Sequence, residues 1–353
     1  MDGIQKILLI RFSSIGDIVL ASPLIRLLKS NFPHAQIDVL VKAEYAELIQ
    51  FNPHLSNVIE LHSSAVSELW SLAQCLRHNS YDVVLDIHDS LRSRLIRFFS
   101  GARRIGKVNK HIIARFLLVK LGVNFYKDPQ PVAVRYLRTA QSLGIGSDNK
   151  RLELFVPDGI RDGVSATIST AMSHGRGPLV GIAPGAKHNT KMWMPERFAE
   201  IATRAVRELD AGILIFGGRS DARLCGEIFR TINAPLEMGR VLDLSGRLSL
   251  LQTAAALDHC DLLLCNDTGI MHIAAARQRR VVAVFGPTVE EFGFYPYGTE
   301  AVVIERKGLS CRPCSHLGSS QCPVGHFRCM KDTSVDEVFN AVCSLVMKQQ
   351  TVS

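Results

Sequence analysis

The sequence predicts an α/β protein made of two units, each built on a parallel β-sheet. Short apolar runs typical of buried strands alternate with segments in which apolar residues recur at helical spacing. This alternation stops at residues 144–178, where Gly, Pro, Ser and Asp are dense at both ends, and then begins again. With 353 residues, the chain is long enough for two domains. We expect these domains to be Rossmann-like and to face one another across a cleft.

The first half opens with Lys6–Ile10 as an apolar strand and Arg11–Gly16 as a polar turn, followed by helical spacing from Asp17. Pro23 lies too deep for the first turn of a helix capped by Asp17, so the helix either kinks there or begins at Ser22. The other strands expected in this half are residues 36–41, 57–61 and 82–87, and the other helices are residues 43–51, 65–78, 90–99, 112–121 and 132–143.

The second half repeats the order of strand, turn and helix, so both sheets are expected to be parallel. Its expected strands are residues 179–183, 213–216, 241–244, 261–265 and 281–285, and its helices are residues 196–209, 221–232, 250–259, 269–277 and 335–347. One more helix is expected within the seam, at residues 160–172. The domains are therefore placed at residues 1–155 and 179–334, with a linker at 156–178 and a final helical segment at 335–353.

Composition and charge favour a globular protein with an anionic partner. Hydrophobic residues make up 47% of the chain and charged residues 21%, and no run is long and apolar enough to suggest a transmembrane helix. The first strand follows directly on MDGIQK, which leaves no room for a signal peptide and favours a cytoplasmic location. The net charge of +8 suits a nucleotide, a phosphorylated lipid, a membrane face or a nucleic acid.

Asp17 stands in the turn after the first strand, where open parallel sheets place their ligands. Gly16 lets the backbone turn there without a Cβ clash. The Asp17 carboxylate can cap the helix that follows, or it can act as an acid–base group in a cleft. The sequence leaves both roles open.

Two turns of the second half offer groups for a donor molecule. Residues 183–193 (APGAKHNTKMW) place Thr190 and Lys191 beside backbone amides ahead of a helix, which suits a phosphate; a basic surface loop is the alternative. In residues 216–228, Asp221 follows a strand-end Gly-Gly turn and can hold sugar hydroxyls.

A third turn, in residues 265–276 (CNDTGIMHIAAA), closes a strand and opens a helix. Asp267, Thr268 and Gly269 lie at the helix N-terminus, where free amides can receive an anion, and His272 follows one turn later. A capped helix with a core histidine is the alternative.

The segment after strand 82–87 is rich in arginine. His88, Arg92 and Arg94 follow this strand and, by the strand-end rule, belong to the ligand-binding edge of the sheet. Arginine binds phosphate and carboxylate with two parallel hydrogen bonds, so this edge suits an anionic acceptor. From Arg92 to Arg115 every charged residue is basic; a solvated helix face is the alternative.

Four of the nine cysteines are clustered with the spacing C-x2-C-x7-C-x6-C, with His316 and His326 between them. In a cytoplasmic chain such thiols fit a structural zinc or iron site better than disulfides, although free thiols are an equal alternative. The spacings differ from those of a standard zinc knuckle, and no catalytic role is expected. The four residues are Cys311, Cys314, Cys322 and Cys329.

Taken together, these segments resemble the ADP-heptose:lipopolysaccharide heptosyltransferases of glycosyltransferase family 9. The resemblance covers nearly the whole chain and rests on four blocks in the same order: RFSSIGDIVLASPLIRLLK, DIHDSLRSRLI, GAKHNTKMWMPERFAEIA and NDTGIMHIAAARQRRVVAVFGPT. The cysteine segment CRPCSHLGSSQCPVGHFRCM resembles the tail of the heptosyltransferase II and III branches.

The resemblance implies a GT-B fold in which the last helix, 335–353, crosses back to the first domain, so that domain one binds the acceptor and domain two the ADP-sugar. It also implies an inverting transfer that needs no metal for catalysis, with Asp17 as the general base. Lys191 matches the lysine that contacts the donor diphosphate. The remaining family positions for the donor nucleotide fall on Asp267, Thr268, Gly269 and His272.

The implied function is transfer of heptose from ADP-L-glycero-D-manno-heptose to the inner core of lipopolysaccharide, a step in Gram-negative outer membrane biogenesis. The acceptor would be a Kdo/heptose–lipid A core, and the enzyme would be cytoplasmic and peripheral to the inner leaflet of the inner membrane. No nucleic-acid partner is expected. The candidate acceptor residues are Arg11, His88, Arg92 and Arg94.

Two other functions remain open on the sequence. A nucleotide-sugar epimerase shares the architecture, but it would not need the arginine-rich segment as an acceptor site. A non-enzymatic protein that binds RNA or another anion would use the same basic segment, but such proteins interleave aromatic and basic residues, and aromatics are 7% of this chain.

Overall fold

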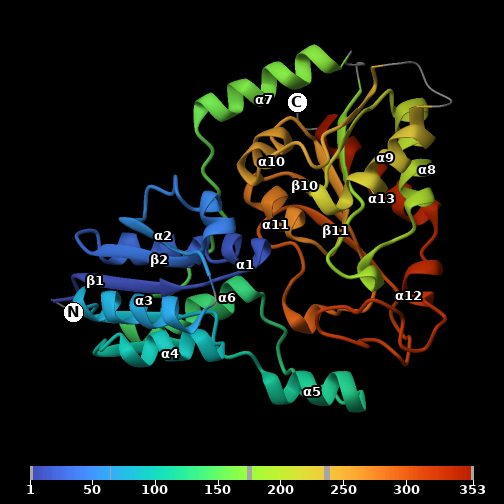
Figure 1. The fold of residues 1–353 in the computed structure, drawn as a ribbon. Helices are drawn as coiled ribbons and strands as arrows, with labels where there is room; N and C mark the ends of the chain where they lie inside the picture. The colour runs from blue at the N-terminus through green and yellow to red at the C-terminus, as the bar shows by residue number, and fades with distance from the viewer. Residues whose placement is uncertain (1–2, 64, 173–176, 234–238, 351–353) are drawn as a thin grey trace. The chain divides into compact units, whose positions relative to one another are not determined.

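The computed structural model describes residues 3–63, 65–172, 177–233 and 239–350. The chain divides into two compact units. Unit 1 comprises residues 1–110 and 130–155, and unit 2 comprises residues 111–129 and 156–353. Figure 1 shows that each unit has its own sheet with helices on both of its faces.

Unit 1 contains a five-stranded parallel sheet in the order β3-β2-β1-β4-β5. Its strands are β1 (Lys6–Ile10), β2 (Gln36–Lys42), β3 (Asn57–Leu61), β4 (Val83–Asp86) and β5 (Arg104–Lys107). Its helices are α1 (Ile15–Val19), α2 (Ser22–Asn31), α3 (Val66–His78), α4 (Leu91–Phe99) and α6 (Val132–Leu137), with 3-10 turns η1 (Ala43–Leu48) and η2 (Arg138–Leu143).

Strand β1 is the centre of unit 1 because both of its faces are covered. Ile7, Leu8, Leu9 and Ile10 are fully buried, as expected for a strand with helices on both sides. Leu8 and Ile10 pack in one core cluster with side chains of α3 and α4, including Leu69. Helix α2 covers the opposite face (Figure 1).

Unit 2 contains a six-stranded parallel sheet in the order β11-β10-β9-β6-β7-β8. Its strands are β6 (Leu179–Ala183), β7 (Gly212–Ile215), β8 (Val241–Asp243), β9 (Leu262–Asn266), β10 (Arg280–Phe285) and β11 (Ala301–Glu305). Its helices are α5 (Ile112–Leu121), α7 (Asp158–Ala171), α8 (Pro195–Leu209), α9 (Ala222–Asn233), α10 (Leu250–Leu257), α11 (Gly269–Ala276), α12 (Arg328–Lys331) and α13 (Val335–Gln350), with 3-10 turns η3 (Asn189–Lys191), η4 (Arg219–Asp221) and η5 (Glu290–Phe292).

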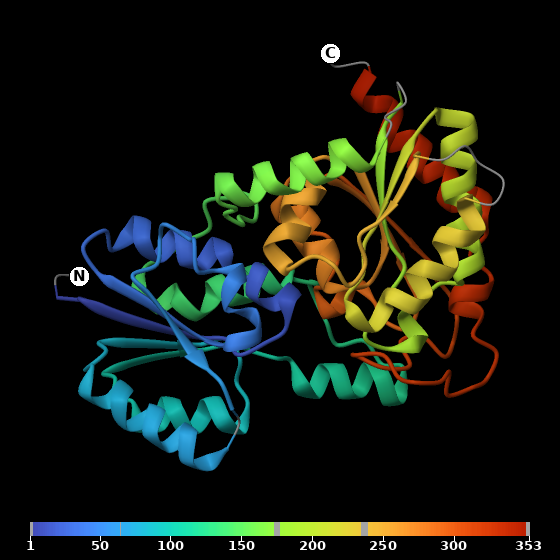
Figure 2. The same cartoon turned by 45° about the horizontal axis from the view of Figure 1, so that its top comes forward.

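The core of unit 2 places α8, α9 and α13 on one face of the sheet, and α10 and α11 on the other (Figures 1 and 2). Trp193 and Phe198 are fully buried at the start of α8, with their rings in edge contact at 5.3 Å. Val338 and Val342 bring α13 into the same cluster.

Three elements were not predicted from the sequence: β5, β11 and α12. The first two are edge strands: β5 (RIGK) is mostly exposed and has no apolar run, whereas β11 (AVVIE) has a short apolar run that is only partly buried and was not identified as a strand. Residues 43–51 were predicted to be a helix, and the structure forms only the 3-10 turn η1 there. The problem posed by Pro23 is resolved by a break, because α1 ends at Val19 and α2 begins at Ser22.

The domain boundaries differ from the predicted ones in three respects. Residues 111–129, which include α5, belong to unit 2 rather than to the first domain. The predicted linker, 156–178, contains α7, and its residues 173–176 lie outside the described part of the chain. Helix α13, assigned from the sequence to a separate final segment at 335–353, packs its apolar side chains into the core of unit 2, and its crossing back to the first domain stays a prediction.

Candidate active site

The strand order reverses once in each sheet, and the candidate residues gather at these two points. In unit 1, β1 lies between β2 and β4, and in unit 2, β6 lies between β7 and β9. Consecutive connections leave in opposite directions from such a strand, so a crevice opens at its carboxyl end. The loops after β1 and β4, and after β6 and β9, are therefore the places to look for a site.

In unit 1, the turn after β1 holds Asp17 in the first turn of α1. The backbone amide of Ser14 donates to Asp17 Oδ2 at 3.2 Å, and the Ser14 hydroxyl donates to the same oxygen at 2.9 Å. One carboxylate oxygen thus has the capping role that the sequence allowed. The other oxygen, Oδ1, is used differently.

Asp17 Oδ1 lies between a cation and a hydroxyl. The Arg11 guanidinium approaches it at 2.6 Å, and the Tyr136 hydroxyl donates to it at 2.9 Å. Burial alone would raise the pKa of the Asp17 carboxyl, but Arg11, Tyr136 and Ser14 together hold this pKa below its ordinary value. Asp17 is therefore ionised at neutral pH, with its side chain 13% exposed.

Arg11 is held by the chain itself. Its Nη1 donates to the carbonyl oxygen of Ile87 at 2.6 Å, and the guanidinium lies 5.5 Å from the centre of the Tyr136 ring. Burial opposes the charge on Arg11, yet Asp17 and the neighbouring groups raise its pKa. These contacts indicate that Arg11 positions Asp17. They argue against the predicted role of Arg11 in contacting the acceptor.

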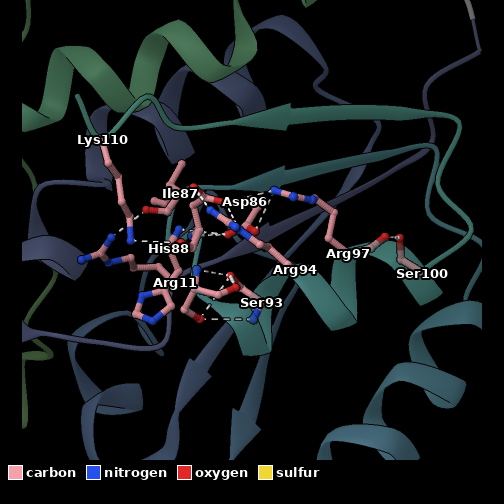
Figure 3. Close-up of polar contacts among 11 residues, drawn as sticks. Arg11, Asp86, Ile87, His88, Ser93, Arg94, Arg97, Ser100 and Lys110 are labelled. Carbon is pink, nitrogen blue, oxygen red and sulfur yellow. Dashed lines mark hydrogen bonds and ion pairs between the residues drawn. The ribbon is translucent and has the colours of Figure 1, made fainter. Parts of the chain in front are cut away.

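The segment after β4 forms a second polar cluster beside Arg11 (Figure 3). Asp86 is fully buried and accepts hydrogen bonds from the amides of His88 and Asp89 at 3.1 and 2.7 Å. Its other oxygen pairs with Arg97 at 3.1 Å. Burial raises the pKa of Asp86 despite these partners. The cluster fixes the turn that carries the predicted acceptor residues.

His88 packs its ring against Phe12, with ring centres 4.8 Å apart. Burial first, and then the charges of Arg11 and Lys110, lower the pKa of His88 to about 3. The imidazole is therefore neutral at physiological pH. Its Nδ1 is buried without a hydrogen-bond partner among the described residues.

The two predicted acceptor arginines differ. Arg94 makes a two-pronged contact with Asp89 at 2.9 and 3.0 Å, and this hydrogen bond raises the pKa of Arg94. Arg92, two residues earlier on α4, is exposed. Lys110, not singled out from the sequence, donates to the carbonyl oxygen of Asp89 at 3.1 Å. Both arginines are exposed on α4, and the Arg94 side chain is 48% exposed despite its pair with Asp89.

In unit 2, the loops after β6 and β9 bring Lys191 and Asp267 together. Lys191 Nζ lies 2.6 Å from Asp267 Oδ2, and the Thr288 hydroxyl donates to the same oxygen at 2.7 Å. The side chains of Lys191 and Asp267 are 14% and 7% exposed. Thr288, which follows β10, ends one of the sequence blocks of the resemblance but was given no role there.

Asn266 joins the two loops and was also missed by the sequence reasoning. Its side-chain amide donates to the carbonyl oxygen of Pro184 at 2.7 Å, and its oxygen accepts from the amide of Trp193 at 3.0 Å. The residue is fully buried. It therefore sets the position of the turn that carries Lys191 relative to Asp267.

Two other residues predicted to bind the ADP-sugar donor, Thr190 and Asp221, bond to the chain itself and not to the Lys191–Asp267 pair. Thr190 is buried, and its hydroxyl bonds to the backbone of Ser319, so it joins two loops. Asp221 lies against Gly185 so closely that a Cβ there would come within 2.5 Å of Asp221 Cγ. Asp221 also accepts a hydrogen bond from the amide of Gly218 at 2.9 Å.

Helix α11 begins directly after the Lys191–Asp267 pair. Thr268 is its N-cap residue and Gly269 its first residue, so the amides of the first turn lie at the same strand end as the pair. His272 is buried, with its ring 6.4 Å from that of Phe294. The burial of His272 favours the reading of a core histidine.

The cysteine-rich segment contacts the loops that carry the residues of this site. Arg312 donates to the carbonyl oxygens of Gly286 and Thr288 at 2.6 and 2.5 Å, and it pairs with Glu305. Gly318 has a φ of +97°, and a Cβ there would come within 2.7 Å of His188. The segment therefore packs against the loops that carry Thr288 and Lys191.

All nine cysteines are free thiols, so the disulfide alternative is not seen. Burial, and then the neighbouring thiols of the segment, raise the pKa of Cys329 to about 11. Cys311 Sγ lies 3.6 Å from His326 Nε2, but the described residues include no group of three or more side chains placed to bind a metal ion. The thiols suit zinc or iron chemically, but as they lie they do not fit one, and a structural metal stays a prediction.

Two units, each built on a parallel sheet with a carboxylate and a cation at its reversal point, make up an α/β architecture of the GT-B type. The sequence model of glycosyltransferase family 9 (heptosyltransferase) matches residues 69–324, and the chain belongs to this family. Its fold and its class as a transferase confirm what the sequence blocks predicted.

Individual proteins are similar to this chain in sequence or in fold. The chain is 29% identical over 310 residues to lipopolysaccharide heptosyltransferase 2 of Salmonella typhimurium, covering 82% of this chain and 84% of the relative. The glycosyl transferase family 9 structure from Veillonella parvula matches with a TM-score of 0.80 at 19% identity, covering 98% of both chains. The structure of ADP-heptose LPS heptosyltransferase II from E. coli matches with a TM-score of 0.76 at 23% identity, covering 98% of this chain and 100% of that one.

Proposed function

We propose that this chain transfers a heptose from an ADP-heptose donor to the inner core of lipopolysaccharide. The names of its relatives support the substrates, and the ionised Asp17 carboxylate at the reversal point of unit 1 carries the mechanism. Family membership favours a transferase over the epimerase and the RNA-binding alternatives.

In the proposed reaction, an acceptor hydroxyl oxygen attacks the anomeric carbon of the donor heptose. The bond from that carbon to the diphosphate oxygen breaks, and ADP leaves with the electron pair. The hydroxyl proton passes to the Asp17 carboxylate, which is ionised at neutral pH because Arg11 and Tyr136 stabilise its charge. Attack opposite to the leaving group inverts the configuration at the anomeric carbon.

The leaving diphosphate is assigned to unit 2. Lys191 supplies a positive charge, and the free amides at the start of α11 supply hydrogen bonds to the developing anion. Asp267 and Thr288 hold the lysine side chain in place before the donor binds. Asp221 and His272 stay candidates for contacts to the donor.

The acceptor is assigned to the edge after β4. Arg92 and Arg94 are the cations suited to the phosphates and carboxylates of a Kdo/heptose–lipid A core, beside the neutral imidazole of His88. Arg11 acts through Asp17 in this proposal, as a positioning residue. A lipid acceptor also requires the enzyme to work at the cytoplasmic face of the inner membrane, as a peripheral protein.

The test is ADP release from ADP-heptose with and without a truncated core lipopolysaccharide. Wild-type protein should release ADP only with the acceptor, and Asp17→Asn should lower kcat by roughly 10²- to 10⁴-fold, the usual contribution of a general base. Asp148→Asn is the matched control, because it breaks another arginine–aspartate pair of unit 1, with Arg26 at 2.8 Å.

ADP release that ignores the acceptor would overturn the transferase proposal in favour of an epimerase or hydrolase. Equal rates for Asp17→Asn and Asp148→Asn would remove Asp17 from catalysis and leave it as a helix cap.

A further inference from the structure

Helix α5 is apolar over most of its surface and yet is not buried. All of its residues except Arg115 and Lys120 are apolar, in the sequence IIARFLLVKL. A helix of this composition is normally enclosed by protein or by lipid. Of its side chains, only that of Leu118 is classed as buried. Ile113 is 78% exposed and Phe116 is 58% exposed.

The exposed apolar surface continues beyond the helix. Val123 and Phe125 follow the αL glycine Gly122, which ends α5, and both are exposed. Contiguous exposed apolar surface of this kind marks an interaction site in a water-soluble unit. We call this surface the α5 patch, and it consists of Ile112, Ile113, Phe116, Leu121, Val123 and Phe125.

The α5 patch has a defined place in unit 2. The Asn124 side chain donates to Glu291 at 2.8 Å, which fixes the turn after the helix to η5. Figures 1 and 2 both draw α5 beside the cysteine-rich segment and outside the helix layers of the sheet. Burial, and then the nearby charge of Arg115, lower the pKa of His316 in that segment. The Asn124–Glu291 hydrogen bond ties the segment that follows α5 to unit 2, while the side chains of the patch stay exposed.

The charged side chains within residues 111–127 are all basic, and the acidic Glu291 of η5 meets this segment at Asn124. From Arg92 to Lys127 the sequence contains no acidic residue, and Arg115, Lys120 and Lys127 lie within or next to the patch. An anionic lipid surface matches both properties, because apolar side chains enter the boundary of headgroups and acyl chains while cations meet the phosphates. A helix of 10 residues is about 15 Å long, too short for a membrane core of about 30 Å, so it would lie in the interface.

We propose that the α5 patch docks this enzyme on an anionic lipid bilayer. This inference rests on the proposed function in one respect, that the acceptor is a lipid. Docking confines the enzyme to the surface that carries its acceptor and so raises the acceptor concentration near the site. No described helix is long and apolar enough to span a membrane, and the patch supplies a different means of membrane contact.

The test is flotation of the full-length protein with vesicles made of equal parts phosphatidylglycerol and phosphatidylcholine. Ile113→Gln should lower the partition coefficient about tenfold, and Ile113→Gln with Phe116→Gln about a hundredfold, because each buried apolar side chain is worth roughly a factor of ten or more. Val66→Gln is the matched control, because Val66 is 77% exposed near the start of α3 and lies in the other unit. Wild-type binding should weaken in high salt and on vesicles of phosphatidylcholine alone.

Equal flotation of the double variant and the wild type would overturn the proposal, as would a wild type that does not float. The proposal would also fail if the patch serves self-association, in which case sedimentation velocity would show a wild-type oligomer that the double variant loses, with no vesicle binding. Failure of the proposed function is a separate result. Asp17→Asn should float as the wild type does, and the double variant should turn over a lipid-free core oligosaccharide at the wild-type rate.

Discussion

The two reversal points carry the same three-part arrangement with different cations. In unit 1 a carboxylate lies between an arginine and a hydroxyl, as Arg11, Asp17 and Tyr136. In unit 2 the carboxylate of Asp267 lies between Lys191 and the Thr288 hydroxyl. The topology of the sheets explains the shared position, and the choice of cation explains the difference in role.

Arginine presents a planar fork with several donors, so Arg11 can bind Asp17 and the Ile87 carbonyl at once and stay fixed. The carboxylate is then the group left to react. Lysine is a point charge on a flexible stem, and its ammonium has three donors. The Lys191 ammonium can therefore stay paired with Asp267 through one N–H group while another N–H group donates to a phosphate. The comparison assigns proton transfer to unit 1 and charge stabilisation to unit 2.

The largest effect in unit 2 is expected from Lys191→Gln. Loss of a cation that stabilises the leaving group should lower kcat by about 10²- to 10³-fold, as for loss of one oxyanion donor. Lys187→Gln is the control, because Lys187 lies in the same loop but is exposed. Steady-state ADP release measures both variants. If only KM changes, Lys191 binds the ground state, and the division of roles between the units is wrong.

A smaller effect, with a distinct pH signature, is expected from Tyr136→Phe. The hydroxyl stabilises the charged form of Asp17, so its loss raises the pKa of this carboxyl. Because the base must be ionised, the acid limb of kcat/KM should move to higher pH, while the plateau near pH 8 falls only a few-fold. A pH–rate profile of the two proteins measures the shift, and an unmoved acid limb would show that another group controls it.

The same variant tests the stability contribution of Asp17. Its folded-state pKa is lowered, so this contribution is fully present above the ordinary pKa of aspartate and is lost as pH falls through the folded-state pKa. Tyr136→Phe should lower the free energy of unfolding by about 1–2 kcal/mol at pH 7. Urea unfolding should show the difference shrinking as pH falls below about 4. A difference that persists unchanged at acid pH would point to lost packing instead.

The smallest effect is expected from Thr288→Val, the corresponding change in unit 2. Asp267 keeps Lys191 when the Thr288 hydroxyl is removed, so the donor KM should rise only a few-fold, with a stability loss of about 1 kcal/mol. Donor titrations and thermal unfolding measure the two quantities. A change in kcat as large as that of Lys191→Gln would show that Thr288 does more than hold the carboxylate.

Much of the fold could be predicted because central strands carry continuous apolar runs. Residues 6–10 and 179–183 were predicted with the bounds that the structure shows, and both are buried central strands. The edge strands β5 and β11 were missed: β5 (RIGK) has no apolar run, and β11 (AVVIE) has one of only four residues that is partly buried. The turns that carry Asp17, Lys191 and Asp267 were identified because they follow such central strands.

The partners of these residues could not be predicted, because they come from distant parts of the chain. Tyr136 lies 119 residues from Asp17, and Thr288 lies 21 residues from Asp267, at the far end of the same sequence block. The roles of Arg11 and Thr190 were also open. Each is a residue type that binds anions, but each is bound by the chain itself.

By itself, the sequence determined the class of fold, the family and the turns at the carboxyl ends of the central strands, because these follow from local patterns of apolar and polar residues. Only the tertiary structure decided which groups surround Asp17 and Lys191, because hydrogen bonds and ion pairs depend on which strands are neighbours. It also decided that α5 is exposed, since the sequence of an apolar helix does not show whether the helix is buried or exposed. Burial and charge pairing are properties of the folded chain, and they set both the pKa of Asp17 and the open face of α5.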